Sequence, residues 1–173
     1  MPTTDGSSSG PTDREVVAFL IGREPMGEFE VVVRRTDGTP VVIENRPLLD
    51  SGRPMPTRYW LADRKLNRVI GTLEAEKGVK RAESELPAHQ IAATHAAYEA
   101  GRAALLPADF DGPVPSGGVG GTRVGVKCLH AHYANRLAGA EDIVGEWVQA
   151  RLEEKGVAFD PSEPGVLTGW QDR

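Results

Sequence analysis

One short segment carries the side chains with the greatest chemical potential: the chain's only cysteine, Cys128, and the histidines His130 and His132. We expect a helix over residues 124–138, in which a turn of about 100° per residue places Cys128 and His132 on one side and His130 on the other. A protonated His132 could then stabilise the Cys128 thiolate and make it a nucleophile. Cys128 and His132 are therefore the catalytic candidates.

The same two side chains could instead be half of a zinc site. Cysteine and histidine are ligands that zinc prefers, and His95 or His89, on the helix expected before this one, could complete the set. The metal candidates are thus His95, Cys128 and His132. A single cysteine is often a small apolar filler, and helical histidines often pack through hydrogen bonds. Structural packing is the simplest interpretation of all three residues, and the sequence implies no particular cofactor.

A glycine-rich stretch over residues 117–123 (GGVGGTR) leads into the expected helix. Free backbone amides at the start of a helix form an anion site, to which Arg123 and Lys127 would add positive charge. The stretch does not fit the dinucleotide fingerprint, because Arg123 stands in place of the third glycine, nor the phosphate loop, because Val126 stands in place of its lysine. We therefore expect a generic phosphate- or carboxylate-binding loop, with a flexible helix entry or tight backbone packing as the alternative.

A polar stripe is expected on the preceding helix, over residues 87–106, where His95, Tyr98 and Arg102 fall on one face. If this face packs against the Cys128 side of the later helix, these three side chains would line one pocket with Cys128 and His132, with the glycine stretch at its mouth. A buried polar network that fixes helix register is the alternative. The expected ligand-binding residues are Gly118, Gly120, Gly121, Arg123, Lys127, Arg102 and Tyr98.

The first half of the chain supplies helix and strand signals. Thr12 and Glu15 form a capping-box pattern ahead of a helix that ends at Gly22. Two β-branched runs, over residues 29–35 and 41–44, flank an Asp-Gly turn and predict a hairpin, and residues 57–61 predict a third strand. Alternation in that strand places Tyr59 on one face and Trp60 on the other, where Trp60 could form a surface for a partner protein.

Helices are expected from Asp63 to about residue 78, and over residues 87–106, 124–138 and 141–155. The predicted fold class is α+β, with a small antiparallel sheet of about three strands (the hairpin plus one) covered by four to five helices. We expect residues 1–11 to be disordered, residues 12–156 to form a single domain, and residues 157–173 to form a loosely packed tail.

Composition excludes several classes of function. The formal net charge of −5 argues against nonspecific binding to nucleic acid, which depends on an excess of Lys and Arg. The longest apolar runs are four to six residues, far below the ~20 needed to span a membrane. The N-terminus lacks the features of a secretory signal, and a single cysteine excludes an intrachain disulfide. We therefore expect a cytoplasmic protein without a membrane span.

Three segments occur together in an order that is similar to a known family: IGREP at residues 21–25, PTRYWL at 56–61 and VKCLHAH at 126–132. They resemble the bacterial family called domain of unknown function 501, over roughly residues 14–150. The resemblance implies a small cytosolic protein, and it implies no reaction, substrate or ligand.

Two classes of function remain. The first is a noncatalytic regulatory or binding protein that recognises a small anionic ligand, bearing phosphate or carboxylate, or a protein partner. The second is an enzyme that acts on a phosphorylated or acyl substrate, using Cys128 or a histidine-bound metal.

Overall fold

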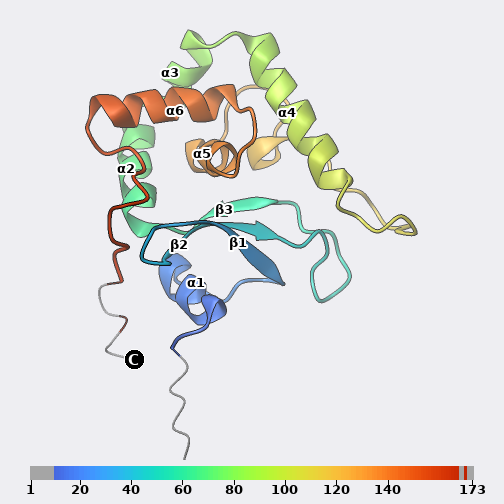
Figure 1. The fold of residues 1–173 in the computed structure, drawn as a ribbon. Coiled ribbons are helices and arrows are strands. Elements are labelled where there is room, and N and C mark those ends of the chain that lie inside the picture. The colour runs from blue at the N-terminus through green and yellow to red at the C-terminus, as the bar shows by residue number, and fades with distance from the viewer. Residues whose placement is uncertain (1–9, 168–169, 171–173) are drawn as a thin grey trace, which may run out of the picture.

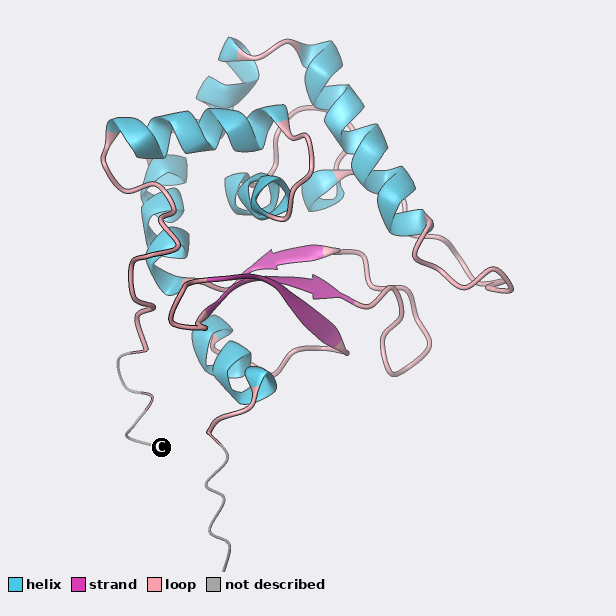
Figure 2. Ribbon diagram, viewed as in Figure 1, coloured by secondary structure: helices cyan, strands magenta, loops and turns pink. Residues whose placement is uncertain are grey.

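The computed structural model describes residues 10–167 and residue 170. These residues form one three-stranded antiparallel sheet and six α-helices (Figures 1 and 2), which confirms the α+β fold class. The expected disorder of residues 1–11 falls, as far as residue 9, outside the described residues. No helix in the described part of the chain has both the length and the apolar character to cross a membrane.

The first helix has the caps that the sequence predicts at both of its ends. Helix α1 (Asp13–Ile21) begins after Thr12, whose side chain accepts the Glu15 amide hydrogen while the Glu15 carboxylate accepts the Thr12 amide hydrogen. It ends at Gly22, which takes the left-handed conformation with φ of 75°. Glycine suits this position because it has no Cβ to clash with the preceding carbonyl.

The predicted hairpin and third strand form the sheet, in the order β1-β2-β3. The strands are β1 (Phe29–Arg34), β2 (Pro40–Asn45) and β3 (Tyr59–Leu61). Strand β2 lies in the centre, and Val41, Val42 and Ile43 are completely buried. They are buried because α1 covers one face of the sheet and α5 lies over the other (Figure 1). In β3 the alternation predicted from the sequence is confirmed, with Tyr59 buried and Trp60 partly exposed.

The helices above the sheet are α2 (Arg64–Ala75), α3 (Gly78–Glu85), α4 (Ala88–Ala103), α5 (Leu129–Leu137) and α6 (Ile143–Glu154). Helix α3 was not expected. Helix α2 ends at Ala75, a few residues before the predicted end near Gly78, and Lys77, with a left-handed φ of 67°, separates it from α3. Gly78 then starts α3 in a position where a Cβ would lie 2.5 Å from the Leu73 carbonyl oxygen, so only glycine fits.

The predicted start of the helix over residues 124–138 is also wrong. Helix α5 begins at Leu129, and Cys128, in an extended conformation, is its N-cap residue. The preceding backbone is held open by distant side chains: the Glu83 carboxylate accepts the Val126 amide hydrogen at 2.7 Å, and His95 Nε2 lies 2.8 Å from the Gly125 carbonyl oxygen. These bonds replace the helical hydrogen bonds that the sequence pattern implied.

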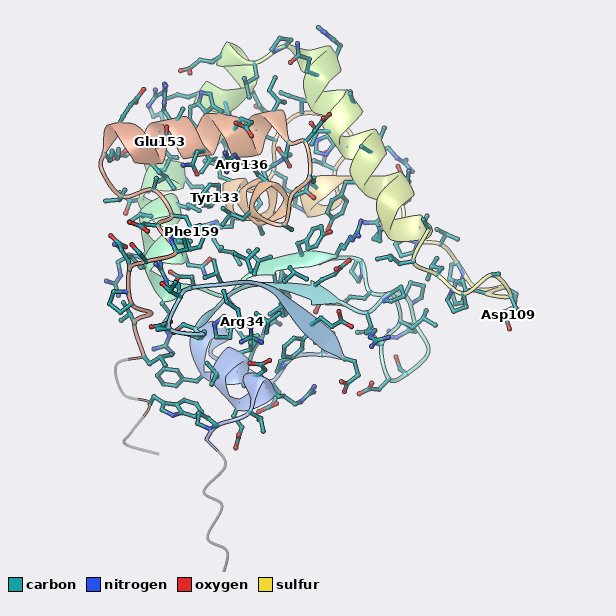
Figure 3. The ribbon with its side chains drawn as sticks, in the orientation of Figure 1. Arg34, Asp109, Tyr133, Arg136, Glu153 and Phe159 are labelled. Carbon is teal, nitrogen blue, oxygen red and sulfur yellow. The ribbon has the colours of Figure 1, made fainter. Side chains whose placement is uncertain are left out.

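Helix α5 lies at the centre of the larger core, with Leu129, Tyr133 and Ala134 completely buried. Tyr133 donates its hydroxyl hydrogen to Gln149 in α6 at 2.6 Å and accepts the Phe159 amide hydrogen at 3.3 Å. Figure 3 labels Tyr133 beside α5 and Phe159 on the segment that follows α6. The central helix thereby holds both α6 and the chain that follows it.

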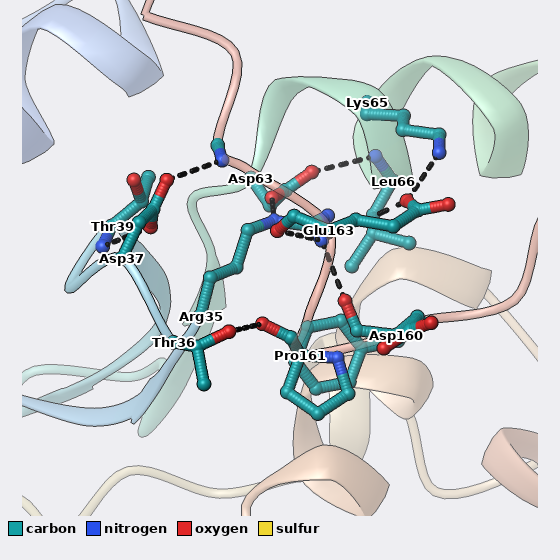
Figure 4. A network of polar contacts seen from close by, with 12 residues as sticks. Arg35, Thr36, Asp37, Thr39, Asp63, Lys65, Leu66, Asp160, Pro161 and Glu163 are labelled. Carbon is teal, nitrogen blue, oxygen red and sulfur yellow. Dashed lines mark hydrogen bonds and ion pairs between the residues drawn. The ribbon is translucent and has the colours of Figure 1, made fainter.

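A buried ion pair joins the hairpin to α2 (Figure 4). Arg35 Nε donates to Asp63 Oδ2 at 2.7 Å, and the two side chains are 1% and 3% exposed. The other Asp63 oxygen accepts the Leu66 amide hydrogen at 2.9 Å, which confirms Asp63 as the N-cap of α2. Arg35 also donates to the carbonyl oxygens of Asp160 and Glu163. One guanidinium therefore connects the hairpin, α2 and residues 160–163, while the division of the chain at residue 157 stays a prediction.

Replacing Asp63 with alanine should lower the free energy of unfolding by about 3–5 kcal/mol, because the buried Arg35 loses its counter-charge and α2 loses its cap. Urea unfolding followed by circular dichroism measures this loss. The control is Asp13→Ala, which breaks an exposed ion pair with Arg34 and should cost no more than about 1 kcal/mol. Equal losses in the two variants would contradict a dominant role for the buried pair.

Candidate functional site

A cavity of about 660 Å³ lies between the end of α1, strand β3, helix α2 and the start of α5. We call it the Cys128 cavity. Cys128, His130 and three arginines line it, and the described lining includes no Asp or Glu. Its lining residues are Leu20, Ile21, Arg23, Thr57, Tyr59, Trp60, Leu61, Arg64, Asn67, Arg68, Gly120, Cys128, His130 and Ala131.

The three arginines of the cavity are held to different degrees. The Arg64 guanidinium donates to the carbonyl oxygens of Phe19 and Leu20 at the end of α1, so its position is fixed. The exposed Arg23 lies over the Trp60 ring, 4.5 Å from its centroid, in a cation–π contact. The Arg68 side chain is exposed and makes no hydrogen bond or ion pair with the described residues, while its backbone carbonyl accepts the Thr72 hydroxyl hydrogen. Arg23 and Arg68 can therefore turn toward a ligand, while Arg64 supplies a fixed charge.

Cys128 and His130, which line this cavity, form a compact cluster with Glu74, which is not among the lining residues. Cys128 Sγ lies 3.9 Å from His130 Nδ1, and His130 Nδ1 lies 3.2 Å from Glu74 Oε1. The same Glu74 oxygen accepts the Leu129 amide hydrogen at 2.7 Å and so caps α5, which Cys128 does not do through its own side chain. One potential ligand atom from each of the three residues lies within 4.8 Å of the others.

Both ring nitrogens of His130 face hydrogen-bond acceptors. Nε2 lies 2.9 Å from the Asn67 carbonyl oxygen, and Nδ1 faces the Glu74 carboxylate. Burial lowers the pKa of His130, but its hydrogen bonds to Cys128 and the Asn67 carbonyl, together with the charge of Glu74, outweigh burial and raise the pKa to about 9. A pKa of about 9 favours the protonated ring at neutral pH.

The predicted pairing of Cys128 with His132 on one helical face is wrong, because Cys128 precedes the helix. Its neighbour is His130, which the sequence analysis placed on the opposite side. His132 is completely buried, and its Nδ1 donates to the Asp142 carboxylate at 2.9 Å. Asp142 also accepts from the Asn135 side-chain amide and from the Gly145 amide. His132 thus lies in a buried polar cluster between α5 and α6.

The polar stripe on α4 is buried, and it does not line the Cys128 cavity. His95 and His132 lie close together, with ring centroids 5.4 Å apart. The predicted pocket shared by the stripe, Cys128 and His132 is nevertheless wrong, because Cys128 is the one member of that set that lines this cavity. His95 accepts the Val119 amide hydrogen, and Tyr98 accepts that of Arg58. These contacts match the alternative of a polar network that fixes how the helices pack.

Arg102, in the same stripe, holds the glycine-rich stretch in place. Its guanidinium donates to the carbonyl oxygens of Pro56, Pro115 and Gly117, each at 2.8 Å. The stretch contains a short 3₁₀ turn, η1 (Val119–Gly121), which ends well before α5 begins, so the glycine amides do not lie at a helix start as expected. Most of this guanidinium's donors are occupied by the protein's own carbonyl groups.

The remaining candidate ligand residues lie apart from one another. Gly118 packs against His95, where a Cβ would lie 2.3 Å from the histidine Cβ, and this contact fits the tight-packing alternative. Gly121 donates its amide hydrogen to the Gly118 carbonyl. Arg123 is exposed and lies 3.4 Å from Glu99, and Lys127 is exposed. Of the glycines, Gly120 alone is among the residues that line the Cys128 cavity, and ligand binding by any of these residues stays a prediction.

Sequence analysis did not select five residues of this site: Arg23, Arg64, Arg68, Glu74 and also His130, which it placed on the side of the helix opposite Cys128. A usable signal was nevertheless present. The three segments that carry the family resemblance, at residues 21–25, 56–61 and 126–132, all contribute side chains to the Cys128 cavity. A cavity to which segments far apart in the chain contribute polar side chains is a candidate site, because ligand sites are concave and have a few convergent polar groups.

Comparison with known proteins gives one match. A family model described as a protein of unknown function (DUF501) matches residues 31–150. No curated protein and no solved structure matches the chain. The comparisons therefore provide a family and no activity.

Replacing Gly118 with alanine should destabilise the protein by about 1–3 kcal/mol, because the added methyl group overlaps His95. The control is Gly71→Ala in α2, where a Cβ meets nothing within 4 Å and alanine should add about 0.5–1 kcal/mol of helix stability. Thermal unfolding of both variants measures the difference. A Gly118→Ala protein as stable as the parent would show that the loop yields and that the packing is not tight.

Proposed function

The chain belongs to the DUF501 family of proteins of unknown function, and we propose that it binds a small anionic ligand in the Cys128 cavity. The observation that carries this proposal is the charge of the cavity wall. Among the described residues, three arginines and no Asp or Glu line it, although the chain as a whole has 25 acidic and 20 basic residues. A positive hollow in an acidic protein attracts anions selectively, because charge in a concave wall is concentrated on the ligand.

The rest of the wall limits the kind of anion. Leu20, Leu61 and Ala131 are apolar, and Trp60 offers an aromatic face. A cavity of about 660 Å³ lies within the range of roughly 300–1,000 Å³ that holds organic ligands. The ligand that fits best is therefore an organic phosphate or carboxylate whose apolar part lies against these side chains and whose charge meets Arg23 and Arg68.

The arginine geometry supports recognition of oxyanions in particular. A guanidinium presents its N–H donors in a plane that matches two oxygens of a carboxylate or phosphate. Arg64 is fixed by backbone carbonyls, so one of the three charges is in place before the ligand arrives, and Arg23 can turn from its contact with Trp60 toward the ligand. Such preorganisation reduces the entropy lost on binding.

An enzyme that acts on a phosphorylated or acyl substrate is the second candidate function. The observation that favours it is the position of Cys128, which is partly exposed at the cavity wall with His130 beside its sulfur. A ligand held by the arginines would lie within the same hollow as this thiol. We propose ligand binding ahead of catalysis, because any reaction in the cavity also requires its substrate to bind there.

Phenyl phosphate and benzoate should bind the protein, while benzyl alcohol, a neutral molecule of similar size, should not. Replacing both Arg23 and Arg68 with glutamine should weaken binding of either anion by about tenfold or more, because each charge-assisted hydrogen bond contributes roughly 1.5–3 kcal/mol. Calorimetric titration measures the affinities, and the two anions distinguish phosphate from carboxylate recognition.

The matched control is the double variant Arg46→Gln and Arg53→Gln. It removes the same charge from two exposed arginines outside the Cys128 cavity, so it should bind both anions as the parent does. Equal weakening in the two double variants would mean that net charge alone attracts the anions. That result would refute the cavity as the site, and so would a failure of both anions to bind.

A further inference from the structure

We propose that Glu74, Cys128 and His130 form a site for a zinc-class divalent metal ion at the wall of the Cys128 cavity, with a fourth coordination position open to the cavity. Three potential ligands of suitable kinds meet there: a thiolate, an imidazole nitrogen and a carboxylate oxygen. These are the groups that bind zinc in proteins, and three protein ligands plus one open position is the arrangement of catalytic rather than structural zinc sites.

The spacing of the three donor atoms is close to what one ion requires. With zinc bonds of about 2.0–2.3 Å in a tetrahedron, neighbouring ligand atoms lie about 3.3–3.6 Å apart. His130 Nδ1 lies 3.2 Å from Glu74 Oε1 and 3.9 Å from Cys128 Sγ, and all three atoms lie within 4.8 Å of one another. Shifts of a few tenths of an ångström for the nitrogen–sulfur pair, and at most about 1.2 Å for the sulfur–oxygen pair, would bring them onto one ion.

The second nitrogen of His130 has the partner that metal-binding histidines usually have. Nε2 lies 2.9 Å from the Asn67 carbonyl oxygen, which can only accept, so Nε2 carries the hydrogen. This bond fixes the ring so that Nδ1 points at Cys128 and Glu74. Metal-bound histidines characteristically donate their other N–H to a carbonyl or a carboxylate, which sets both the tautomer and the orientation.

The backbone holds the ligands on two rigid elements. Glu74 lies in the last turn of α2, while Cys128 and His130 lie at the start of α5. The Leu129 amide, between these two, donates to Glu74 Oε1 at 2.7 Å and brings the helices together. A carboxylate has about four lone-pair positions on its two oxygens, so Glu74 can keep this bond and still bind the ion.

Charge also favours a dication at this place. A thiolate and a carboxylate supply two negative charges, and a metal on Nδ1 makes the imidazole a neutral ligand, so an ion of charge +2 leaves the cluster neutral. The mixture of sulfur, nitrogen and oxygen ligands suits zinc and its close analogue cobalt better than magnesium or calcium, which prefer oxygen alone.

The open position faces the cavity through Cys128 and His130, which both line it. An oxygen of the anionic ligand would occupy this position while Arg23 and Arg68 meet its remaining charge. Only this fourth ligand rests on the proposed function. The metal site itself rests on its three protein donors and is tested without any anion.

The test uses the full chain, produced without a polyhistidine tag, and titrates it with Co²⁺ alone. One equivalent should bind and give the near-ultraviolet absorption of a thiolate–cobalt bond, which identifies Cys128 because the chain has no other cysteine. Zn²⁺ should displace Co²⁺. In the parent protein, Zn²⁺ should also slow alkylation of Cys128 by iodoacetamide by at least about tenfold, a readout that needs no variant.

The variants Cys128→Ser, His130→Gln and Glu74→Gln should each weaken Zn²⁺ binding by more than the roughly 10–100-fold that follows loss of an outer-sphere partner. Glu74→Gln keeps an oxygen for the Leu129 amide, so the cap of α5 survives. The control is His89→Gln, an exposed histidine on α4, which should bind Zn²⁺ as the parent does. Circular dichroism shows that each variant is folded.

Three outcomes would overturn the metal site: no stoichiometric binding of Co²⁺, a thiolate band that persists in Cys128→Ser, or Cys128 alkylation that Zn²⁺ does not slow. Phenyl phosphate is then added to the Co²⁺-loaded protein. A changed visible spectrum supports an anion in the open position, and an unchanged spectrum overturns that assignment alone. Anion binding to the metal-free protein is measured separately, so failure of either proposal is seen independently of the other.

Discussion

The hydrogen bond from the Leu129 amide to the Glu74 carboxylate, at 2.7 Å, determines where helix α5 begins. Because the cap comes from another helix, Cys128 is left outside α5 in an extended conformation. That placement turns the thiol toward His130 and the cavity. Helix α5 in turn contributes to the main core and contacts the sheet, α2 and α6. One interaction between two helices therefore sets both the packing at the centre of the molecule and the chemistry at its wall.

The parts of the fold that the sequence predicted are those fixed by neighbouring residues. The capping box of Thr12 and Glu15, the cap at Asp63 and the turn at Gly38 each involve residues within three or four positions, so the pattern contains the whole interaction. The start of α5 is decided by Glu74, Glu83 and His95, which lie far away in the chain. Helical periodicity contains no information on these long-range bonds, so the sequence analysis extended the predicted helix through Cys128.

The same difference between local and long-range contacts decides which residues of the candidate site the sequence could predict. Sequence reasoning selected Cys128 and Gly120, which line the cavity, because a lone cysteine and a glycine-rich stretch stand out locally. It dismissed His130, since a helix through residue 128 turns that ring away from the thiol. The arginines come from α2 and the segment after α1, and only the folded chain brings them together. Arg102 is a ligand-binding candidate from the sequence and His95 a metal candidate with packing as the simpler interpretation; in the fold both are buried and form hydrogen bonds with the glycine stretch.

The three bonds of Arg102 have a consequence for how the chain can be modified. They bind the carbonyl oxygens of Pro56, Pro115 and Gly117, so the backbone is held in place at residues 115 and 117. The preceding loop is different: Asp109 lies at its outer tip, away from the sheet and the helices (Figure 3), and it is exposed. Exposed loop tips tolerate insertions well. The segment around Asp109 is therefore a natural attachment point for a reporter peptide or a fluorescent domain, placed where it leaves the cavity untouched.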